Sequence, residues 1–158
     1  MPGDHNEAVA LFRRGPELLD AAIAGVSAEE SKFVPAPGKW TIRQILRHLT
    51  DCEIVAGMRL RQMIAEDRPV MAMFDQDQWA EHLHYSNCDV FDSAMKFRIL
   101  RDDMSDFLEP LSAEEFERIG LHPERGLWTL REWVNHFGIH TEKHVQQIRS
   151  IREAWSRR

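Results

Sequence analysis

Two histidines, His140 and His144, lie four residues apart in a stretch with helical periodicity. On an α-helix this spacing places both imidazoles on one face, one turn apart, where their ring nitrogens can reach a single metal ion. The pair is also in line with Phe137, Ile148 and Ile151, which predicts that it faces the interior. An inward imidazole pair needs either hydrogen-bond partners or a metal, so the spacing indicates a candidate metal site.

A third histidine, His48, strengthens this interpretation, because helical phase places it on the apolar face of another stretch, between Ile45 and Cys52. If the two helices are neighbours, the three inward histidines predict a divalent metal site with one or more positions left for an exogenous molecule, as in catalytic centres. The other interpretation is three core histidines bonded to backbone or carboxylate groups. Zn²⁺ is the expected ion, and Ni²⁺ and Fe²⁺ accept the same nitrogens.

Two further residues flank this candidate site. Cys52 follows His48 by one turn, so it is either a fourth ligand that closes the site or a small buried thiol that packs in the core. His136 lies one turn before His140 and is interpreted as a residue that packs around the ligands. A role of His136 as the fourth ligand is the alternative.

The other candidate residues show no comparable spacing. His82, His84 and Tyr85 stand together in a segment without periodicity and are interpreted as solvated loop residues, with a place at the edge of a pocket as the alternative. His122 precedes Pro123 and is interpreted as part of a turn. The sequence contains no Gly-rich phosphate loop, no G-x-S-x-G and no H-E-x-x-H.

These histidines must be positioned by helices, because apolar residues return every three to four positions along most of the chain. An all-α fold is expected, with Gly15-Pro16 kinking or splitting the first helix, because proline lacks an N–H donor. The segment 67–90 is expected to be a long crossover loop with a short helix near 75–82. A short helical turn near 112–115 and a loop at 120–127 are also expected. The four long helices are predicted at about residues 6–25, 41–66, 91–109 and 129–155.

An internal repeat marks the starts of the second and fourth long helices. Trp40-Thr41-Ile42-Arg43 is followed by His48, and Trp128-Thr129-Leu130-Arg131 is followed at the same spacing by His136. The repeat predicts two helical hairpins related by pseudo-symmetry. The simpler interpretation is shared helix-start chemistry, with tryptophan as a hydrophobic staple and threonine as the N-cap.

Length and composition narrow the function classes. The 158 residues suit one domain, 1–158, and the net charge of −6 argues against electrostatic binding of nucleic acid or of an anionic membrane. No apolar stretch approaches the ~20 residues of a membrane span. Two cysteines and no basic-apolar leader predict a cytoplasmic protein.

Three segments together resemble the DinB/YfiT-like superfamily: KWTIRQILRHLTDCE at 39–53, GLHPERGLWTLREW at 120–133, and the H-x3-H-x3-H-x2-Q-I pattern at 136–148. The resemblance covers nearly the whole chain. It implies a four-helix bundle with long crossover connections in up-down-down-up order and a divalent metal at one end of the interior. Transferred residue by residue, it implies His48 as the first ligand and His140 and His144 as the last two.

The resemblance also implies a chemistry. Members of the superfamily include S-transferases and an isomerase that depend on low-molecular-weight thiols, others are named hydrolases, and many are dimers. The favoured expectation is therefore transfer of such a thiol to a small electrophile. The alternatives are a hydrolase that uses metal-bound hydroxide and a non-catalytic, metal-stabilised binding or stress-response protein. The expected partners are a small-molecule substrate and a second copy in a homodimer, with no nucleic acid and no membrane.

Overall fold

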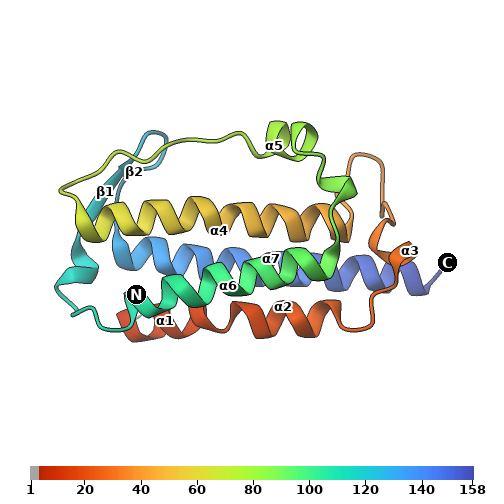
Figure 1. The fold of residues 1–158 in the computed structure, drawn as a ribbon, viewed down its shortest axis with the longest axis horizontal. Helices are drawn as coiled ribbons and strands as arrows, with labels where there is room; N and C mark the ends of the chain where they lie inside the picture. Colours follow the sequence, from red (N-terminus) through yellow and green to blue (C-terminus); the bar gives the residue numbers. More distant parts are fainter. Residues whose placement is uncertain (1–3) are drawn as a thin grey trace.

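In the computed structural model, which describes residues 4–158, four helical columns lie side by side (Figure 1). α4 packs against α6 and α7, and α1 and α2 pack against α6 and α7 from the other side. The first column and α7 run in one direction while α4 and α6 run in the other, which confirms the up-down-down-up bundle. The columns are α1 (His5–Arg13) with α2 (Gly15–Ile23), α4 (Ile42–Ala65), α6 (Val90–Leu108) and α7 (Leu130–Ser156).

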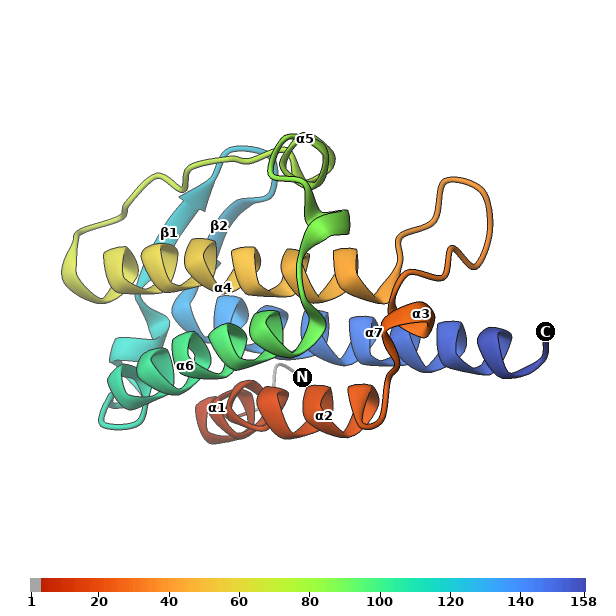
Figure 2. The ribbon, with the colours of Figure 1, turned by 45° about the vertical axis from the view of Figure 1, so that its right-hand side comes forward.

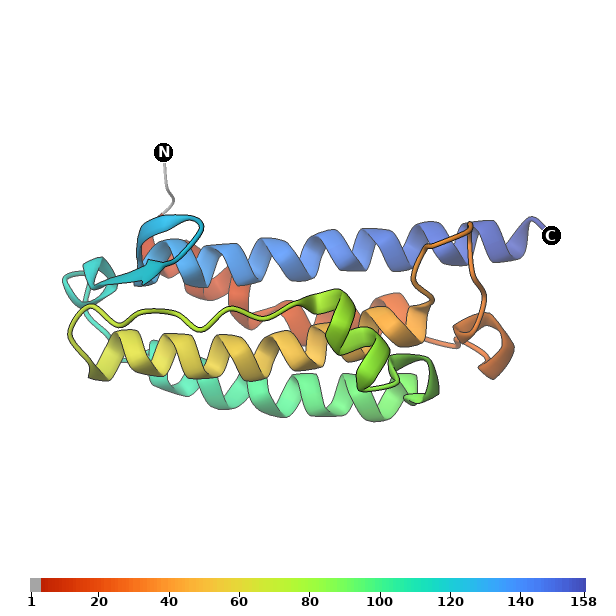
Figure 3. The ribbon, with the colours of Figure 1, turned by 90° about the horizontal axis from the view of Figure 1, so that it is seen from above.

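A long crossover makes α4 and α6 parallel. The segment between them contains α5 (Gln76–His82) and the 3₁₀ helix η1 (Tyr85–Asn87), and it runs back along α4, as Figures 2 and 3 show. This confirms the predicted crossover and its short helix. The connection from α2 to α4 carries the short helix α3 (Ala28–Ser31). Within residues 4–158, no helix combines the length and the apolar character that a membrane span requires.

The segment 120–127, predicted as a loop, is a β-hairpin, so this prediction was wrong. β1 (Ile119–His122) pairs with β2 (Gly126–Thr129) in antiparallel register, after the short 3₁₀ helix η2 (Glu115–Glu117). The strands are too short for alternation to be visible in the sequence. The crossover segment, distant in sequence, stabilises the hairpin, because the N–H of Leu121 donates to the carbonyl of Pro69 at 2.9 Å.

The break between α1 and α2 follows from proline chemistry. Pro16 has no N–H to donate to the carbonyl of Phe12 four residues earlier, and Nη1 of Arg101 donates to that carbonyl instead, at 2.6 Å. Gly15 leaves room for this contact, since a Cβ there would lie 2.7 Å from the same Nη1. The predicted split of the first helix is therefore confirmed, and a buried arginine stabilises it.

α4 and α7 begin with the same local chemistry. The Thr41 hydroxyl accepts from the N–H of Gln44 while the Gln44 side chain accepts from the N–H of Thr41, and Thr129 and Glu132 form the matching pair. Both helices therefore start with a capping box, which confirms the threonine N-caps expected from the repeat. Because the two helices run in opposite directions, their starts lie at opposite ends of the bundle.

The core consists of two apolar clusters separated by a polar layer. One cluster joins α2, the first half of α4 and the last turns of α7, and the other joins α1, the second half of α4 and the first turns of α7. Between them, buried Arg101 donates from Nε to Glu53 at 2.7 Å and from Nη2 to Thr141 at 3.0 Å. On α7, the residues between the two clusters include His140 and His144.

Candidate metal centre

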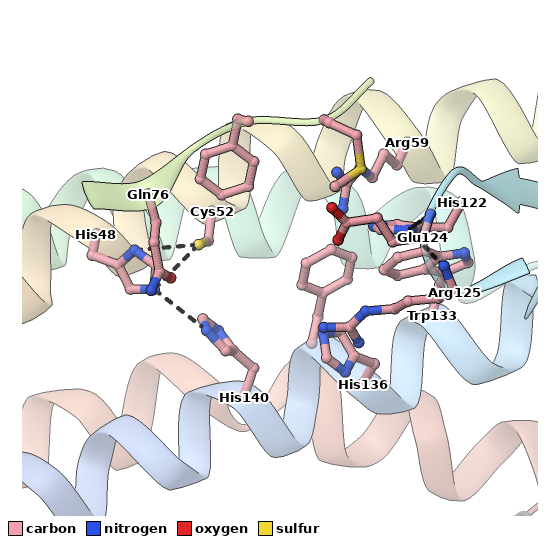
Figure 4. Close-up of a pocket in the computed structure, with 13 residues that line it drawn as sticks. His48, Cys52, Arg59, Gln76, His122, Glu124, Arg125, Trp133, His136 and His140 are labelled. Atoms are coloured by element: carbon pink, nitrogen blue, oxygen red, sulfur yellow. Dashed lines mark hydrogen bonds between the residues drawn. The ribbon is translucent and has the colours of Figure 1, made fainter. Parts of the chain in front are cut away.

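Three histidines from two helices converge between the apolar clusters. Nε2 of His140, on α7, lies 3.4 Å from Nε2 of His48, on α4, and 3.2 Å from Nε2 of His144, one turn further along α7. The His48 ring centroid lies 5.3 Å and 5.0 Å from the centroids of His140 and His144. The structure thus brings together the three histidines that helical phase selected, and Figure 4 shows two of them facing each other across the gap between the helices.

The hydrogen bonds of these rings leave lone pairs without donors. Nδ1 of His144 lies 2.9 Å from Oε1 of Gln147, which can only accept, so a neutral His144 carries its proton on Nδ1 and a lone pair on Nε2. The Nε2 of His140 is approached by two ring nitrogens, and one N–H cannot make two good hydrogen bonds. A divalent cation would take all these lone pairs at once.

The spacing of the nitrogens also suits a metal ion. Zinc binds imidazole nitrogen at about 2.0 to 2.1 Å, so a tetrahedral ion holds two such nitrogens about 3.3 to 3.4 Å apart. The Nε2 separations of 3.4 and 3.2 Å are close to this value. Each of these two histidine pairs therefore has the separation of two nitrogen ligands on one divalent ion.

Burial keeps these imidazoles in the neutral form that binds metals. Burial, with a smaller contribution from His144, lowers the pKa of His48 to about 4. Burial and the neighbouring histidines lower the pKa of His140 to about 2. Both side chains are therefore uncharged at neutral pH, and their lone pairs are available to a cation.

Cys52 lies in contact with the histidine cluster. Its Sγ is 3.6 Å from Nε2 of His48, and His48, Cys52 and His140 each offer a ligand atom within 4.8 Å of the others. Burial, Glu53 and Asp51 raise the pKa of the Cys52 thiol to about 12, so without a cation the sulfur stays protonated. The structure thus contains two overlapping triads, which share His48 and His140 and differ in His144 or Cys52.

A cavity of about 340 Å³ opens beside the histidines and extends toward the β-hairpin (Figure 4). His48, Cys52 and His140 line one end, and Met73 and Phe74 of the crossover line its wall. Its size and mixed lining suit a small molecule that bears both apolar and polar groups. The residues toward the hairpin are Arg59, His122, Glu124, Arg125, Trp133 and His136.

His136 lies on the cavity wall. Its ring packs edge-on against Trp128 and Trp133, and its centroid lies 6.2 Å from that of His140. Each repeat places its tryptophan against its own histidine, with centroids 4.9 Å apart for Trp40 and His48 and 5.5 Å apart for Trp128 and His136.

His136 should make the stability of the metal-free chain depend on pH. Burial first, then positive neighbours led by Arg125, lower its folded-state pKa from 6.5 to about 4. Between these two pH values the unfolded chain binds a proton at His136 that the folded chain does not. The contribution of His136 to the free energy of unfolding is therefore fully present above pH 6.5 and is lost as the pH falls from 6.5 toward about 4. Urea unfolding of the metal-free chain across this range should show a shallower loss for His136→Gln than for the wild type. Parallel curves would contradict this assignment.

Two sequence interpretations were wrong at this site. Tyr85, expected to be solvated, is fully buried, and its hydroxyl donates to Oδ2 of Asp51 at 2.6 Å. His122, interpreted as part of a turn, is the last residue of β1, directly before the turn at 123–125, and it is buried and lines the cavity. His82 and His84 are exposed, as expected.

Arg59 was not singled out from the sequence, although a signal was present. It follows Cys52 by seven residues and His48 by eleven, both close to whole helical turns, so the three share a face of α4. An arginine on an otherwise apolar face is a buried cation, and such a residue needs a partner.

Comparisons with known proteins agree with this architecture. The family model described as the DinB superfamily matches residues 11–148. A protein of Oceanobacillus iheyensis named "Putative metal-dependent hydrolase" is 30% identical over 152 residues, which cover 95% of this chain and 88% of that protein. The "Uncharacterized protein YuaE" of Bacillus subtilis is 26% identical over 143 residues, covering 83% of this chain and 88% of that protein.

A solved structure shares the fold. YfiT from Bacillus subtilis, described as a probable metal-dependent hydrolase with an unusual four-helix bundle topology, matches with a TM-score of 0.89 at 20% identity. The match covers 96% of this chain and 87% of that one. Together with the family model, which spans most of the sequence, these findings identify the family. The chain belongs to the DinB superfamily.

Proposed function

We propose that this protein is a metal-dependent enzyme in which His48, His140 and His144 hold a divalent ion next to the substrate cavity. The observation that carries the proposal is the convergence of their three rings between α4 and α7, with His48 and His140 lining one end of that cavity. The relative named as a metal-dependent hydrolase supports it. Zinc as the ion, and a homodimer as the assembly, stay predictions from the sequence.

His48, His140 and His144 would hold the ion through neutral imidazoles and leave it its full charge, which would lower the pKa of a water or thiol nucleophile at neutral pH. The protein supplies orientation. Gln147 holds His144 in the tautomer whose Nε2 carries the lone pair, and the Trp40 ring packs on His48. Apolar side chains of the crossover and of α7, including Phe74 and Phe137, line the cavity and limit the access of water.

The reaction we propose is transfer of a low-molecular-weight thiol to a small electrophile. The thiol loses its proton to solvent, its sulfur bonds to the electrophilic carbon, and the bond from that carbon to its leaving group breaks with the electron pair. The cavity supports this choice because its aromatic wall suits a substrate with an apolar part, while Arg59 and Arg125 suit the carboxylates of a thiol such as glutathione. Hydrolysis is the second candidate, and the name of the Oceanobacillus relative favours it.

A fluorogenic electrophile distinguishes these reactions. The zinc-loaded protein is incubated with monochlorobimane and, in turn, glutathione, bacillithiol or mycothiol. We expect at least one thiol to react faster with the protein present, and we expect His144→Ala to abolish that acceleration because it removes a proposed ligand. His84→Ala is the matched control, since His84 is exposed and lies outside the cavity.

The negative outcomes separate the alternatives. Acceleration that persists in His144→Ala would contradict catalysis at this centre. No acceleration with any thiol, together with His144-dependent cleavage of a model ester, would favour hydrolysis. Failure of both reactions in protein that retains its metal would favour a non-catalytic binding role.

A further inference from the structure

Two buried hydrogen-bond donors line the far end of the cavity without an acceptor. Nε of Arg59 and Nε1 of Trp133 have no hydrogen-bond partner among residues 4–158. The two side chains are only 6% and 1% exposed, and the guanidinium carbon of Arg59 lies 5.2 Å from the Trp133 ring centroid. Nearly all buried polar groups in native proteins are hydrogen-bonded. Two neighbouring donors without partners therefore point to an acceptor that does not belong to the chain.

His122 provides a third donor beside them. Its Nδ1 accepts from the backbone N–H groups of Glu124 and Arg125, each at 3.2 Å, so a neutral His122 carries its proton on Nε2. Burial and then the positive charges of Arg59 and Arg125 lower the pKa of His122, which favours this neutral form. The His122 and Trp133 ring centroids are 5.5 Å apart, so the three donors form one cluster.

The cluster also carries an uncompensated positive charge. Arg59 and Arg101 are the buried arginines of residues 4–158, and Arg101 pairs with Glu53. Arg59, by contrast, forms no salt bridge with any residue in this range, and one of its nitrogens, Nη2, donates to the carbonyl of Ala72 at 2.6 Å. A buried cation without a counter-charge is unfavourable, and an anionic ligand would relieve this.

Glu124 does not fill this role within the described structure. Glu124 lines the cavity, but it is exposed to solvent and forms no salt bridge with Arg59 or Arg125. Arg125 is likewise exposed, with its guanidinium carbon 5.4 Å from the ring centroid of Trp128. The acceptor position next to Arg59 is therefore left to a ligand.

The position of the cluster defines the shape of that ligand. Figure 4 shows Arg59 and His122 at the end of the cavity opposite His48. Arg59 follows His48 by eleven residues on one face of α4, which corresponds to about 16 Å along the helix axis. A molecule that contacts both ends must be elongated, with its anionic group separated from its reacting atom.

We propose that Arg59, Trp133 and His122 form an anion-binding subsite for the carboxylate or phosphate of an elongated small molecule, whose reacting end lies at the three histidines. The placement of the reacting end at the histidines rests on the proposed function. The anion subsite itself does not, because its donors come from the chain and bind an anion whether or not a metal is present.

The test follows the indole N–H signals of the five tryptophans by ¹H–¹⁵N NMR in the full chain, first metal-free and then zinc-loaded. Inorganic phosphate and acetate are titrated separately. We expect one of them to shift the Trp133 indole signal saturably in the metal-free protein, and the anion that does so identifies the ligand group. Arg59→Gln should weaken this binding at least about tenfold, because charge-assisted hydrogen bonds are lost. Arg61→Gln should leave it unchanged, since Arg61 is on the same helix but pairs with Asp103.

The outcomes are distinct from those of the enzyme assay. No saturable Trp133 shift with either anion, or an unchanged affinity in Arg59→Gln, would overturn the subsite. If Arg59→Gln fails to fold, the wild-type titration still decides, and Glu124→Gln adds a second measurement. That variant should bind the anion more tightly, because it removes a like charge from the cavity, and weaker binding would count against the subsite. Anion binding without thiol transfer or hydrolysis would refute the proposed function alone.

Discussion

Replacing His140 with alanine is expected to weaken zinc binding by more than about 100-fold. Loss of a hydrogen bond that only supports a ligand weakens metal binding by about 10- to 100-fold, and this variant removes a proposed ligand itself. The Nε2 of His140 is the atom that both other histidines approach, at 3.4 and 3.2 Å. The variant would remove a proposed nitrogen ligand, the one that lies next to both of the others. Calorimetric titration of the metal-free protein with zinc in competition with a chelator measures the change.

Graded variants test the ligand set within the same experiment. Gln147→Ala should weaken binding by about 10- to 100-fold, because it releases the tautomer of His144 without removing a ligand. His144→Ala should have an effect similar to that of His140→Ala, and Cys52→Ala should have a much smaller one. If Cys52→Ala weakens zinc binding strongly and His144→Ala weakens it only slightly, Cys52 takes the place of His144 in the triad. Wild-type affinity in His140→Ala would contradict a metal site on these histidines.

The second large effect concerns stability. Arg101→Ala is expected to lower the free energy of unfolding by about 3 to 5 kcal/mol, because it leaves Glu53 as an uncompensated charge in the core. It also leaves the Phe12 carbonyl, at the break before Pro16, without its donor. Urea unfolding of the metal-free protein, monitored by circular dichroism, measures the loss.

A matched arginine on the same helix serves as the control. Arg98 pairs with Glu17 and Asp20 at the surface, so Arg98→Ala should cost less than about 1 kcal/mol. The double variant Arg101→Met with Glu53→Leu should recover much of the loss, because it removes both buried charges together. An Arg101→Ala cost no larger than that of Arg98→Ala would refute the assigned role of the polar layer.

The features that the sequence predicted well depend on local periodicity. The long helices, the break at Pro16, the threonine N-caps and the convergence of His48, His140 and His144 all follow from spacing along one helix or from helix-start chemistry. Helical phase alone shows which face a side chain occupies. It predicts a convergence once the faces of two helices are assumed to meet, as α4 and α7 do here.

The features that were missed depend on contacts between distant segments. Tyr85 is buried because η1 packs on α4 and places its hydroxyl at Asp51, thirty-four residues away. The hairpin is supported by the crossover through Leu121 and Pro69. No local pattern encodes either contact. Arg59 is different, because its helical phase was visible, but its missing partner became evident only when its surroundings were known.

The most direct test is anomalous diffraction at the zinc edge from crystals of protein purified without metal-affinity resin and supplied with zinc. We expect one strong peak per chain, at about 2.0 to 2.1 Å from the Nε2 atoms of His48, His140 and His144. A crystal that shows these three rings ordered with no ion between them, or the ion bound elsewhere, would contradict this expectation.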